Sequence, residues 1–461
     1  MIIKTIPSTW IIEEEHRLDC GPFVKGSVEA RKTIEALPCL KNRLVDVTKD
    51  GINGIYHVGQ DKIVWVEDEE LGLPFVRSSD ILKADLSSQP LISRRQVAAN
   101  HLFQCPEGTT LITRSGTIGR MAYMRSDMVD TAISQDVLKV VPDERKIRSG
   151  YLYAFLNSKY GLPIVTGGTF GSIIVHIEAE NISSLPVPRL GEVEERAHEL
   201  VRQAAQLRVQ ASKLISEQIG ELEEEIAGGP IKWDHKNPQA FSVGTQTVNR
   251  FFNRLDAFHY IGFVGEALQK AKVPLVEIVH HADALYPPFM KRIWVEEGGV
   301  EFLGGAEMLM LDQRSDSHIA SSTKDLDQFV VKEGYVLFQC DGQRYGIFGR
   351  PVLANRNIIG KAVTQHMMRI IPHDKRDAGY IFTYLATGFG RRLLMRFSAG
   401  TSIPSLNEDG ARKILIYWPD EERRRTVSQI AEQAWENRAQ ATELEDQARS
   451  LVERTIEEGA R

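Results

Sequence analysis

The chain is poor in cysteine, and the cysteines that it has lie far apart. Its 461 residues include four, Cys20, Cys39, Cys105 and Cys340, with no Cys-x-x-Cys pair among them. This spacing argues against a zinc ribbon and against a disulfide framework, and it fits a reducing compartment. We therefore expect a cytoplasmic protein without a structural metal site.

Long apolar runs are also lacking. No run approaches the roughly 20 residues that a membrane-spanning helix needs. The first residues, Met1-Ile-Ile-Lys-Thr-Ile-Pro7, carry neither a basic region nor a cleavable apolar stretch. These absences predict a protein that is not secreted and has no membrane partner.

Motifs of nucleotide binding and catalysis are missing as well. The glycine loops lack both the Walker lysine and the Gly-x-Gly-x-x-Gly spacing. Tyr286-Pro287-Pro288-Phe289 resembles the catalytic tetrapeptide of adenine methyltransferases, but a tyrosine stands where that motif begins with Asn, Asp or Ser. His280 and His281 are adjacent, so on a strand their side chains point to opposite faces and rarely share one ion. We expect no catalytic residue, no metal and no cofactor in this chain.

The net charge of −6 is unevenly distributed. Residues 191–227 hold nine acids and four bases, and residues 419–461 hold eleven acids and seven bases. These two segments contribute −9, which leaves the rest of the chain at +3. A balance this close to neutral neither requires nor excludes a nucleic-acid partner.

What the sequence does contain is an internal duplication. Five short patterns recur in the same order, 226 to 237 residues later. The pairs are Arg17-Leu18-Asp19 with Arg254-Leu255-Asp256, Gly108–Gly116 with Gly334–Gly342, Ile133–Asp136 with Val363–His366, Gly150-Tyr151 with Gly379-Tyr380, and Gly168-Thr169 with Gly400-Thr401. Chance matches would not remain collinear.

Each half begins as a mixed α/β domain. Short β-branched or aromatic runs, punctuated by Gly, Pro and Asp, predict strands. The predicted strands cover 63–66, 110–113 and 137–141 in the first half, and 335–338 and 367–371 in the second. Helix-like stretches follow at 150–157 and 378–387.

Each half then becomes helical, with apolar residues at heptad spacing. The first seam runs through Val193, Ala197, Leu200, Ala204, Leu207, Ala211 and Leu214, and it slips by one residue before Ile219, Leu222 and Ile226. The second has one row at Val427, Ala434, Ala441 and Ala448, and another at Ile430, Leu444 and Leu451. The seams predict that the two helices pack on each other or on a partner.

The order of these parts predicts the architecture. Domain 1 covers 1–188, spacer helix 1 covers 189–228, a connector covers 229–248, domain 2 covers 249–418 and spacer helix 2 covers 419–461. Gly228-Gly229-Pro230 ends the first helix. We expect two antiparallel helices forming a coiled-coil-like rod of about 55 Å, with similar globular domains related by a pseudo-two-fold axis. That length corresponds to roughly 16 base pairs of duplex.

Loop sequences in both halves extend the pattern. The first half contains Thr113-Arg-Ser-Gly-Thr-Ile-Gly-Arg120, Ser134-Gln135-Asp136, Gly167-Gly-Thr-Phe-Gly-Ser172 and Leu185-Pro-Val-Pro188. The second contains Phe397-Ser-Ala-Gly-Thr-Ser-Ile-Pro-Ser405 and Pro419-Asp-Glu-Glu-Arg-Arg-Arg425. Together with the doubled order of domain and helix, they resemble the DNA specificity (S) subunit of type I restriction–modification systems. The second half departs from the pattern at Cys340–Gly346, where the loop is longer.

The resemblance implies two target-recognition domains that read a bipartite site on double-stranded DNA. It implies a subunit that is not itself catalytic but recruits DNA adenine methyltransferase subunits, which would bind the S-adenosylmethionine. Where the complex also restricts, restriction–translocase subunits would join it. The spacer helices would form the docking surface, with Leu200, Leu207, Leu214, Leu222, Ile430, Leu444 and Leu451 as the partner-binding residues.

Candidate DNA-binding residues follow from side-chain chemistry. Arginine, lysine and small hydroxyl side chains contact phosphates, and Arg and Gln also read the edges of guanine and adenine. The candidates are Arg94, Arg95, Arg114, Ser115, Thr117, Arg120, Gln343, Arg344, Arg350, Arg356, Asn357 and Lys361. A structural hairpin with solvated arginines is the other interpretation of these loops.

Two further interpretations of the whole chain stay open at this point. A protein–protein scaffold of a related defence complex could have the same repeat architecture. An enzyme, such as a nuclease or a methyltransferase, would need catalytic residues that the sequence does not bring together.

Overall fold

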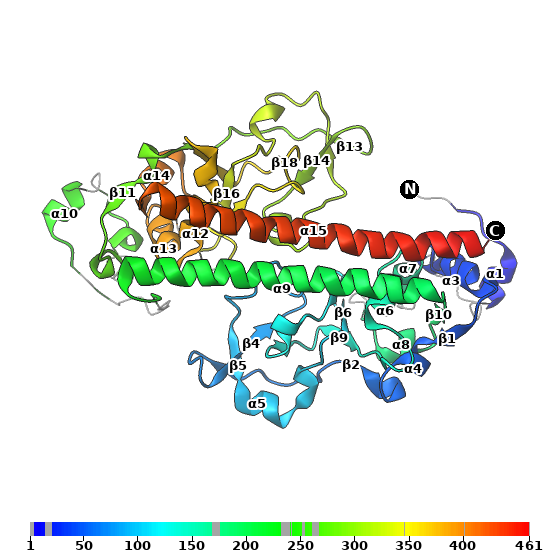
Figure 1. The fold of residues 1–461 in the computed structure, drawn as a ribbon. Helices are drawn as coiled ribbons and strands as arrows, with labels where there is room; N and C mark the ends of the chain where they lie inside the picture. The colour runs from blue at the N-terminus through cyan, green and yellow to red at the C-terminus, as the bar shows by residue number, and fades with distance from the viewer. Residues whose placement is uncertain are drawn as a thin grey trace. The chain divides into compact units, whose positions relative to one another are not determined.

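The computed structural model describes residues 4–13, 21–167, 176–231, 240, 242–250, 254–260, 267–344, 346–400 and 402–460 (Figure 1). The chain packs into two compact units. The first unit comprises Met1–Val209 and Gln440–Arg461, and the second comprises Gln210–Ala439. The recurring segments Arg17-Leu18-Asp19 and Gly168-Thr169 lie outside the described residues, and so do Thr401 and residues 232–239 and 241 of the predicted connector.

The first unit contains two four-stranded sheets and one two-stranded sheet. The first four-stranded sheet has the order β2 (Ile55–Tyr56), β9 (Val137–Val140), β6 (Thr110–Thr113), β7 (Met121–Tyr123). The second has the order β3 (Trp65–Val66), β5 (Leu91–Ser93), β4 (Gly72–Val76), β8 (Ala132–Ile133). The two-stranded sheet pairs β1 (Lys41–Arg43) with β10 (Pro186–Pro188).

The second unit repeats this topology strand for strand. Its sheets have the orders β12 (Ala282–Leu285), β19 (Met367–Pro372), β16 (Val336–Gln339), β17 (Pro351–Leu353), and β13 (Trp294–Val295), β15 (His318–Ile319), β14 (Val300–Leu303), β18 (Ala362–Val363). The two-stranded sheet pairs β11 (Leu275–Glu277) with β20 (Leu415–Tyr417). In both units the pairing of the fourth and eighth strands is parallel, whereas the other pairings are antiparallel. The duplication seen in the sequence is therefore a duplication of fold.

The central strands are short and buried on both faces. Every residue of β6 and β9 is buried, which explains why neither strand shows the alternation of apolar and polar residues that is typical of a half-exposed strand. The predicted strands at 110–113, 137–141, 335–338 and 367–371 are confirmed with shifts of one residue at their ends. The predicted strand at 63–66 is shorter, because only Trp65 and Val66 pair with β5.

One buried helix packs on the sheets of each unit. In the first unit it is α6 (Ser149–Leu156), followed by α7 (Gly161–Gly167). In the second it is α12 (Ala378–Ala386), followed by α13 (Gly388–Met395). All eight residues of α6 are buried, and so are residues 378–385 of α12. These helices confirm the predicted helical stretches.

Two long helices, α9 (Glu192–Ala227) and α15 (Glu421–Gly459), complete the fold (Figure 1). Within the first unit, Arg208 of α9 bonds to Glu445 of α15. Within the second, Glu221, nearer the end of α9, bonds to Arg423, near the start of α15. The partners run in opposite directions along the chain, so the helices are antiparallel, as predicted. The fold class, mixed α/β with two similar domains and two long helices, is confirmed.

The seam residues divide between core and half-buried positions. Leu200 and Leu222 are buried in the cores of the first and second units. The other five predicted partner-binding residues are half-buried: Leu207, Leu214, Ile430, Leu444 and Leu451. Packing inside the chain accounts for Leu200 and Leu222 without a partner, and the docking role of the set stays a prediction.

Among the described residues, no helix is both long and apolar enough to cross a membrane.

Candidate nucleic-acid interface

Each unit brings one loop and one turn together at the ends of its central strands. In the first unit the loop 114–120 joins β6 to β7, and the turn 134–136 joins β8 to β9. The backbone amide of Arg114 donates to the Asp136 carbonyl at 3.0 Å. The Ser115 hydroxyl donates to Asp136 Oδ1 at 2.7 Å. We call this arrangement, and its counterpart in the second unit, the loop–turn pair.

Glycines shape the first loop. Gly116 and Gly119 have φ of 70° and 83°, a region that favours glycine. At Gly119 a Cβ would come within 2.4 Å of Thr166 Cγ2 on α7, so the loop approaches α7 closely. The hydroxyl of Thr113 donates to the Thr117 carbonyl at 2.6 Å. The loop is thus held in place by a hydrogen bond across its base and by packing against α7.

Arg114 holds this loop to its surroundings. Its guanidinium donates to the carbonyls of Ile177 and Gln135 at 3.1 and 3.4 Å, and it forms an ion pair with Glu178. The side chain is buried. Arg114 and Ser115, both predicted to contact DNA, are therefore engaged inside the chain, while Thr117 and Arg120 are exposed.

The second unit has the same pair with a longer loop. Residues 340–350 join β16 to β17, and residues 364–366 form the turn between β18 and β19. The Cys340 amide donates to the His366 carbonyl at 2.9 Å, the same link that Arg114 makes with Asp136. Asp341 Oδ2 lies 2.7 Å from His366 Nδ1, where Ser115 and Asp136 meet in the first unit. The carboxylate sits on the turn in one unit and on the loop in the other.

Tyr286 adds a third member to this link. Its hydroxyl donates to Asp341 Oδ2 at 3.1 Å. Burial and the nearby Asp341 carboxylate raise the pKa of Tyr286 to about 12, so the hydroxyl remains a donor at neutral pH. The Tyr286-Pro287-Pro288-Phe289 segment therefore helps to hold the loop 340–350 in place through the hydrogen bond from Tyr286 to Asp341.

The loop of the second unit carries three predicted DNA-binding side chains. Gln343 is exposed and donates to the Ser402 carbonyl at 2.8 Å. The Arg344 guanidinium lies 3.7 Å from the centre of the Phe258 ring, and its Nε donates to the Ser398 hydroxyl at 2.8 Å. Arg350 donates to the Gly346 carbonyl at 3.2 Å within the loop. Stacking and hydrogen bonds thus preorganise the guanidinium of Arg344.

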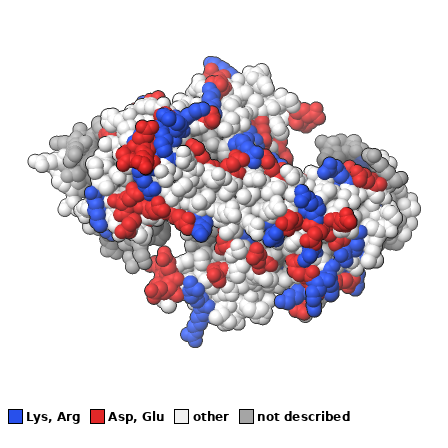
Figure 2. Space-filling view, in the orientation of Figure 1, with Lys and Arg blue, Asp and Glu red and all other residues white. Residues whose placement is uncertain are grey.

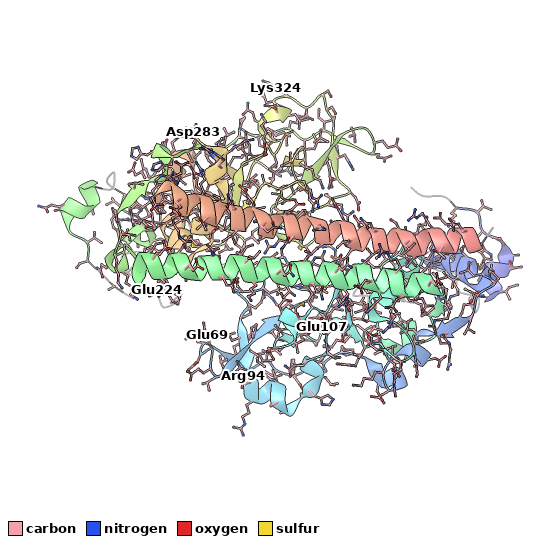
Figure 3. All side chains as sticks on the ribbon, viewed as in Figure 1. Glu69, Arg94, Glu107, Glu224, Asp283 and Lys324 are labelled. Atoms are coloured by element: carbon pink, nitrogen blue, oxygen red, sulfur yellow. The ribbon has the colours of Figure 1, made fainter. Side chains whose placement is uncertain are left out.

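The remaining predicted residues lie apart from the loop–turn pairs in the sequence. Arg94 and Arg95 are exposed at the start of α5 (Arg94–Ala99), and Figure 3 labels Arg94. Arg356 pairs with Glu436 of α15 at 3.1 Å. Lys361 pairs with Glu301 of β14 at 2.9 Å and donates to the Gln313 carbonyl. Asn357 is half-buried beside them.

The charged surface is mixed. Figure 2 shows basic and acidic side chains interspersed over the face that carries α9 and α15. No group of three or more His, Cys, Asp or Glu among the described residues could hold a metal ion. His281 instead stacks on Trp418, with ring centroids 3.8 Å apart. The DNA-contact assignments remain predictions.

Sequence reasoning missed the partners that fix these loops. Asp136, Glu178, Asp341 and His366 are not among the candidates, yet each bonds to one of the loop segments. Their signal was present in the repeat. Ser115 and Asp341 are 226 residues apart, and Asp136 and His366 occupy matching positions in the recurring turn. The carboxylate stands on the turn in one half, at Asp136, and on the loop in the other, at Asp341. Such a swap between two pairs of matching positions indicates that the paired positions are in contact, and it can be seen in a single sequence.

Comparisons with known proteins gave matches among solved structures only. No family model and no curated protein matches the chain. The S subunit of a type I restriction–modification system from M. genitalium is 11% identical, with a TM-score of 0.32, and the match covers 91% of this chain and 95% of that one. A second match, from a structural study of complex assembly and conformational transition of the type I system, is 13% identical, with a TM-score of 0.29 and coverage of 91% and 98%.

A third match is the HsdS subunit from Thermoanaerobacter tengcongensis, 14% identical, with a TM-score of 0.27 and coverage of 91% and 97%. At these identities and TM-scores the likeness supports no statement about function, which has to rest on this chain's own residues.

Proposed function

We propose that this chain is the DNA specificity subunit of a type I restriction–modification complex. The observation that carries the proposal is the doubled loop–turn pair. Both units place a loop and a turn on the same strand framework, held by the same backbone link, but they present different side chains. Two domains with the same strand framework but different exposed side chains are suited to a DNA target that consists of two different half-sites.

The exposed groups fit such a target. Thr117 and Arg120 project from the first loop and Gln343 from the second, and these side chains contact phosphates or base edges. The chain would not carry the chemistry itself. Methyl transfer, and the S-adenosylmethionine that it consumes, would belong to DNA adenine methyltransferase subunits that take the target base out of the helix. Restriction–translocase subunits would be further partners.

The test is a binding selection on random duplex DNA, with the chain purified together with its methyltransferase subunit. We expect enrichment of a split motif, two short conserved blocks separated by a spacer of fixed length. Binding should weaken steeply with salt, because each phosphate neutralised contributes a slope of about −0.9 in log K against log salt. A complex that binds with no preference for any bipartite duplex would instead be a protein scaffold.

Paired variants sharpen this test. Arg120→Ala should weaken binding to all sequences and make the salt slope shallower by about 1, if Arg120 contacts a phosphate. Arg145, which pairs with Asp143 outside the loop–turn pair, is the matched control. Arg145→Ala should leave the slope unchanged.

A further inference from the structure

An exposed tryptophan occurs at the same place in both units. Trp65-Val66-Glu67 and Trp294-Val295-Glu296 are identical in sequence, and an acidic residue follows each. Trp65 lies on β3 and Trp294 on β13, the edge strands of equivalent sheets. Trp65 pairs with Ile92 and Trp294 with Ile319, so the register is the same. The side chains are 54% and 52% exposed.

Each tryptophan ring is held in the same way. Trp65 meets Phe75 edge to face, with centroids 5.4 Å apart and an interplanar angle of 88°. Trp294 meets Phe302 at 5.3 Å and 85°. Both phenylalanines are buried, Phe75 on β4 and Phe302 on β14 of the four-stranded sheet whose edge is formed by β3 or β13. One side of each indole is therefore supported by the core, and the other half faces outward.

A neighbouring glycine completes the shared packing. A Cβ at Gly72 would come within 2.9 Å of Val66 Cγ2, and a Cβ at Gly299 within 2.6 Å of Val295 Cγ2. The valine after each tryptophan is thus tucked against glycine, which sends the tryptophan to the opposite face of the strand. The geometry that exposes the ring is repeated, even though the loops around it differ in length.

Apolar side chains adjoin each ring. Val64 is exposed beside Trp65, and Ile293 is exposed beside Trp294. A large aromatic residue next to an exposed aliphatic one, at matched positions of two domains, is typical of a contact surface. Tryptophan is among the residues that contribute most binding free energy in protein interfaces.

The charges indicate which kind of molecule would cover these rings. Glu67, Asp68, Glu69 and Glu70 follow Trp65, and Glu296 and Glu297 follow Trp294, all exposed; Figure 3 labels Glu69. One exposed lysine is shared, Lys62 and Lys291, each three residues before the tryptophan, whereas the nearby arginines differ between the units. What the two sites share is thus an aromatic ring with at least two carboxylates and one lysine beside it, so that acidic groups outnumber basic ones in the common part. Carboxylates repel a phosphate backbone and attract Lys and Arg of a protein.

We propose that Trp65 and Trp294 are equivalent docking anchors for one protein partner, which binds once to each unit. The partner surface would offer an apolar cleft for an indole, rimmed by lysine or arginine. The inference rests on the proposed function, in which that partner is the methyltransferase subunit. It adds two sites, at the edge strands β3 and β13, to the docking surface expected on the helices.

The experiment measures the number of methyltransferase subunits bound to the full chain, and their affinity, by titration calorimetry with sedimentation. Wild type should bind two. Trp65→Ala and Trp294→Ala should each weaken one of the two sites by about 30-fold or more, and the double variant should weaken both. Trp65→Phe and Trp294→Phe should restore most of the affinity, because a ring remains against the phenylalanine.

Matched controls remove exposed apolar side chains elsewhere. Leu40 is 67% exposed in the first unit, and Ile403 is 70% exposed in the second. Leu40→Ala and Ile403→Ala should leave both sites unchanged. Thermal unfolding of every variant checks that the units remain folded.

Charge reversal separates a protein partner from DNA. Glu67→Lys and Glu296→Lys should weaken methyltransferase binding. If the rings contact DNA instead, these reversals would strengthen DNA binding and leave the methyltransferase unaffected, which would overturn the proposal. It would equally be overturned if the double alanine variant still bound two subunits with wild-type affinity, or if it lost only self-association of the chain. Failure of wild type to bind the methyltransferase at all would instead refute the proposed function, and this docking role with it.

Discussion

At the scale of single residues, the recurring Gly-Tyr pair has a packing role. A Cβ on Gly150 would lie 2.7 Å from the His198 carbonyl oxygen, and one on Gly379 would lie 2.5 Å from that of Ser428. The glycines thus let α6 and α12 approach the long helices. The tyrosine that follows the glycine is held as well: the Tyr151 hydroxyl donates a hydrogen bond to the carbonyl of Pro188 at the end of β10. The sequence shows that the pair recurs, and only the packing shows why.

We therefore expect Gly150→Ala and Gly379→Ala to destabilise their units by about 1–3 kcal/mol, because backbone atoms on the facing helix must move. The control is Gly220→Ala in α9, where nothing lies within 4 Å of the new methyl group. That variant should gain about 0.5–1 kcal/mol from higher helix propensity. Calorimetric unfolding measures all three. Equal effects of Gly150→Ala and Gly220→Ala would contradict the close-approach explanation.

Lys139 is a second residue whose role only the structure reveals. It lies in the centre of β9 and is fully buried, and its Nζ has no hydrogen-bond partner among the residues that the structure describes. Its ammonium lies 5.5 Å from the centre of the Tyr56 ring. Burial lowers the pKa of Lys139 from 10.5 to about 8, although Cys105 opposes this. The equivalent residue, Arg369, instead donates to the carbonyls of Val363, at the end of β18, and of Thr364 in the turn.

The lowered pKa gives a prediction with a definite sign. Between about pH 8 and 10.5 the unfolded chain holds a proton on Lys139 that the folded chain does not, so stability rises with pH across this window. Below it, the buried charge costs on the order of 3 kcal/mol. Lys139→Met should therefore stabilise the first unit at pH 7 and gain progressively less above pH 8. A stability difference independent of pH, measured by urea unfolding at several pH values, would rule this out.

At the scale of elements, the long helices are the best-predicted part of the chain. The heptad spacing gave both helices to within a few residues, and Gly228 and Gly229, with φ of 75° and 135°, end α9 where expected. Asn437, which interrupts the second seam, is buried and accepts a hydrogen bond from Gln433 at 2.8 Å. The antiparallel pairing of the helices was predicted, but the ion pair between Arg208 and Glu445 was not, because 237 residues separate the two side chains in the sequence.

That ion pair is testable. Arg208 is 5% exposed, and its Nη2 lies 3.0 Å from Glu445 Oε2. Arg208→Ala or Glu445→Ala should destabilise the first unit by about 1.5–3 kcal/mol, because each removes a charge-assisted hydrogen bond from a largely buried ion pair. Replacing both residues with leucine should be neutral or stabilising. The measurement is hydrogen exchange of the backbone amides in residues 192–209. If the double leucine variant lost as much stability as the two single alanine variants together, the explanation would be refuted.

At the scale of the whole molecule, the duplication could be recognised in the sequence because the shared topology allows only a few residue types at certain positions. Glycines at close approaches and turn residues between central strands recur, so collinear matches survive. What could not be predicted is which side chains face outward, since strands of two residues have no periodicity to read. Trp65 lies in a predicted strand and Trp294 in none, and the positions of both on edge strands are known only from the structure. Arg114 and Lys361 read as free cations, although both pair inside the chain.

The central claim is that each unit reads its own half of a split target. The most direct measurement is selection of random duplexes by the methyltransferase complex carrying Thr117→Ala in the first unit or Gln343→Ala in the second. Each variant should relax base preference in one block of the motif, by about 1–3 kcal/mol at the affected position, and leave the other block and the spacer unchanged. Gln328→Ala, at an exposed glutamine of the second unit outside the loop, should change neither block. If either loop variant altered both blocks, or neither, the two units would not be independent readers.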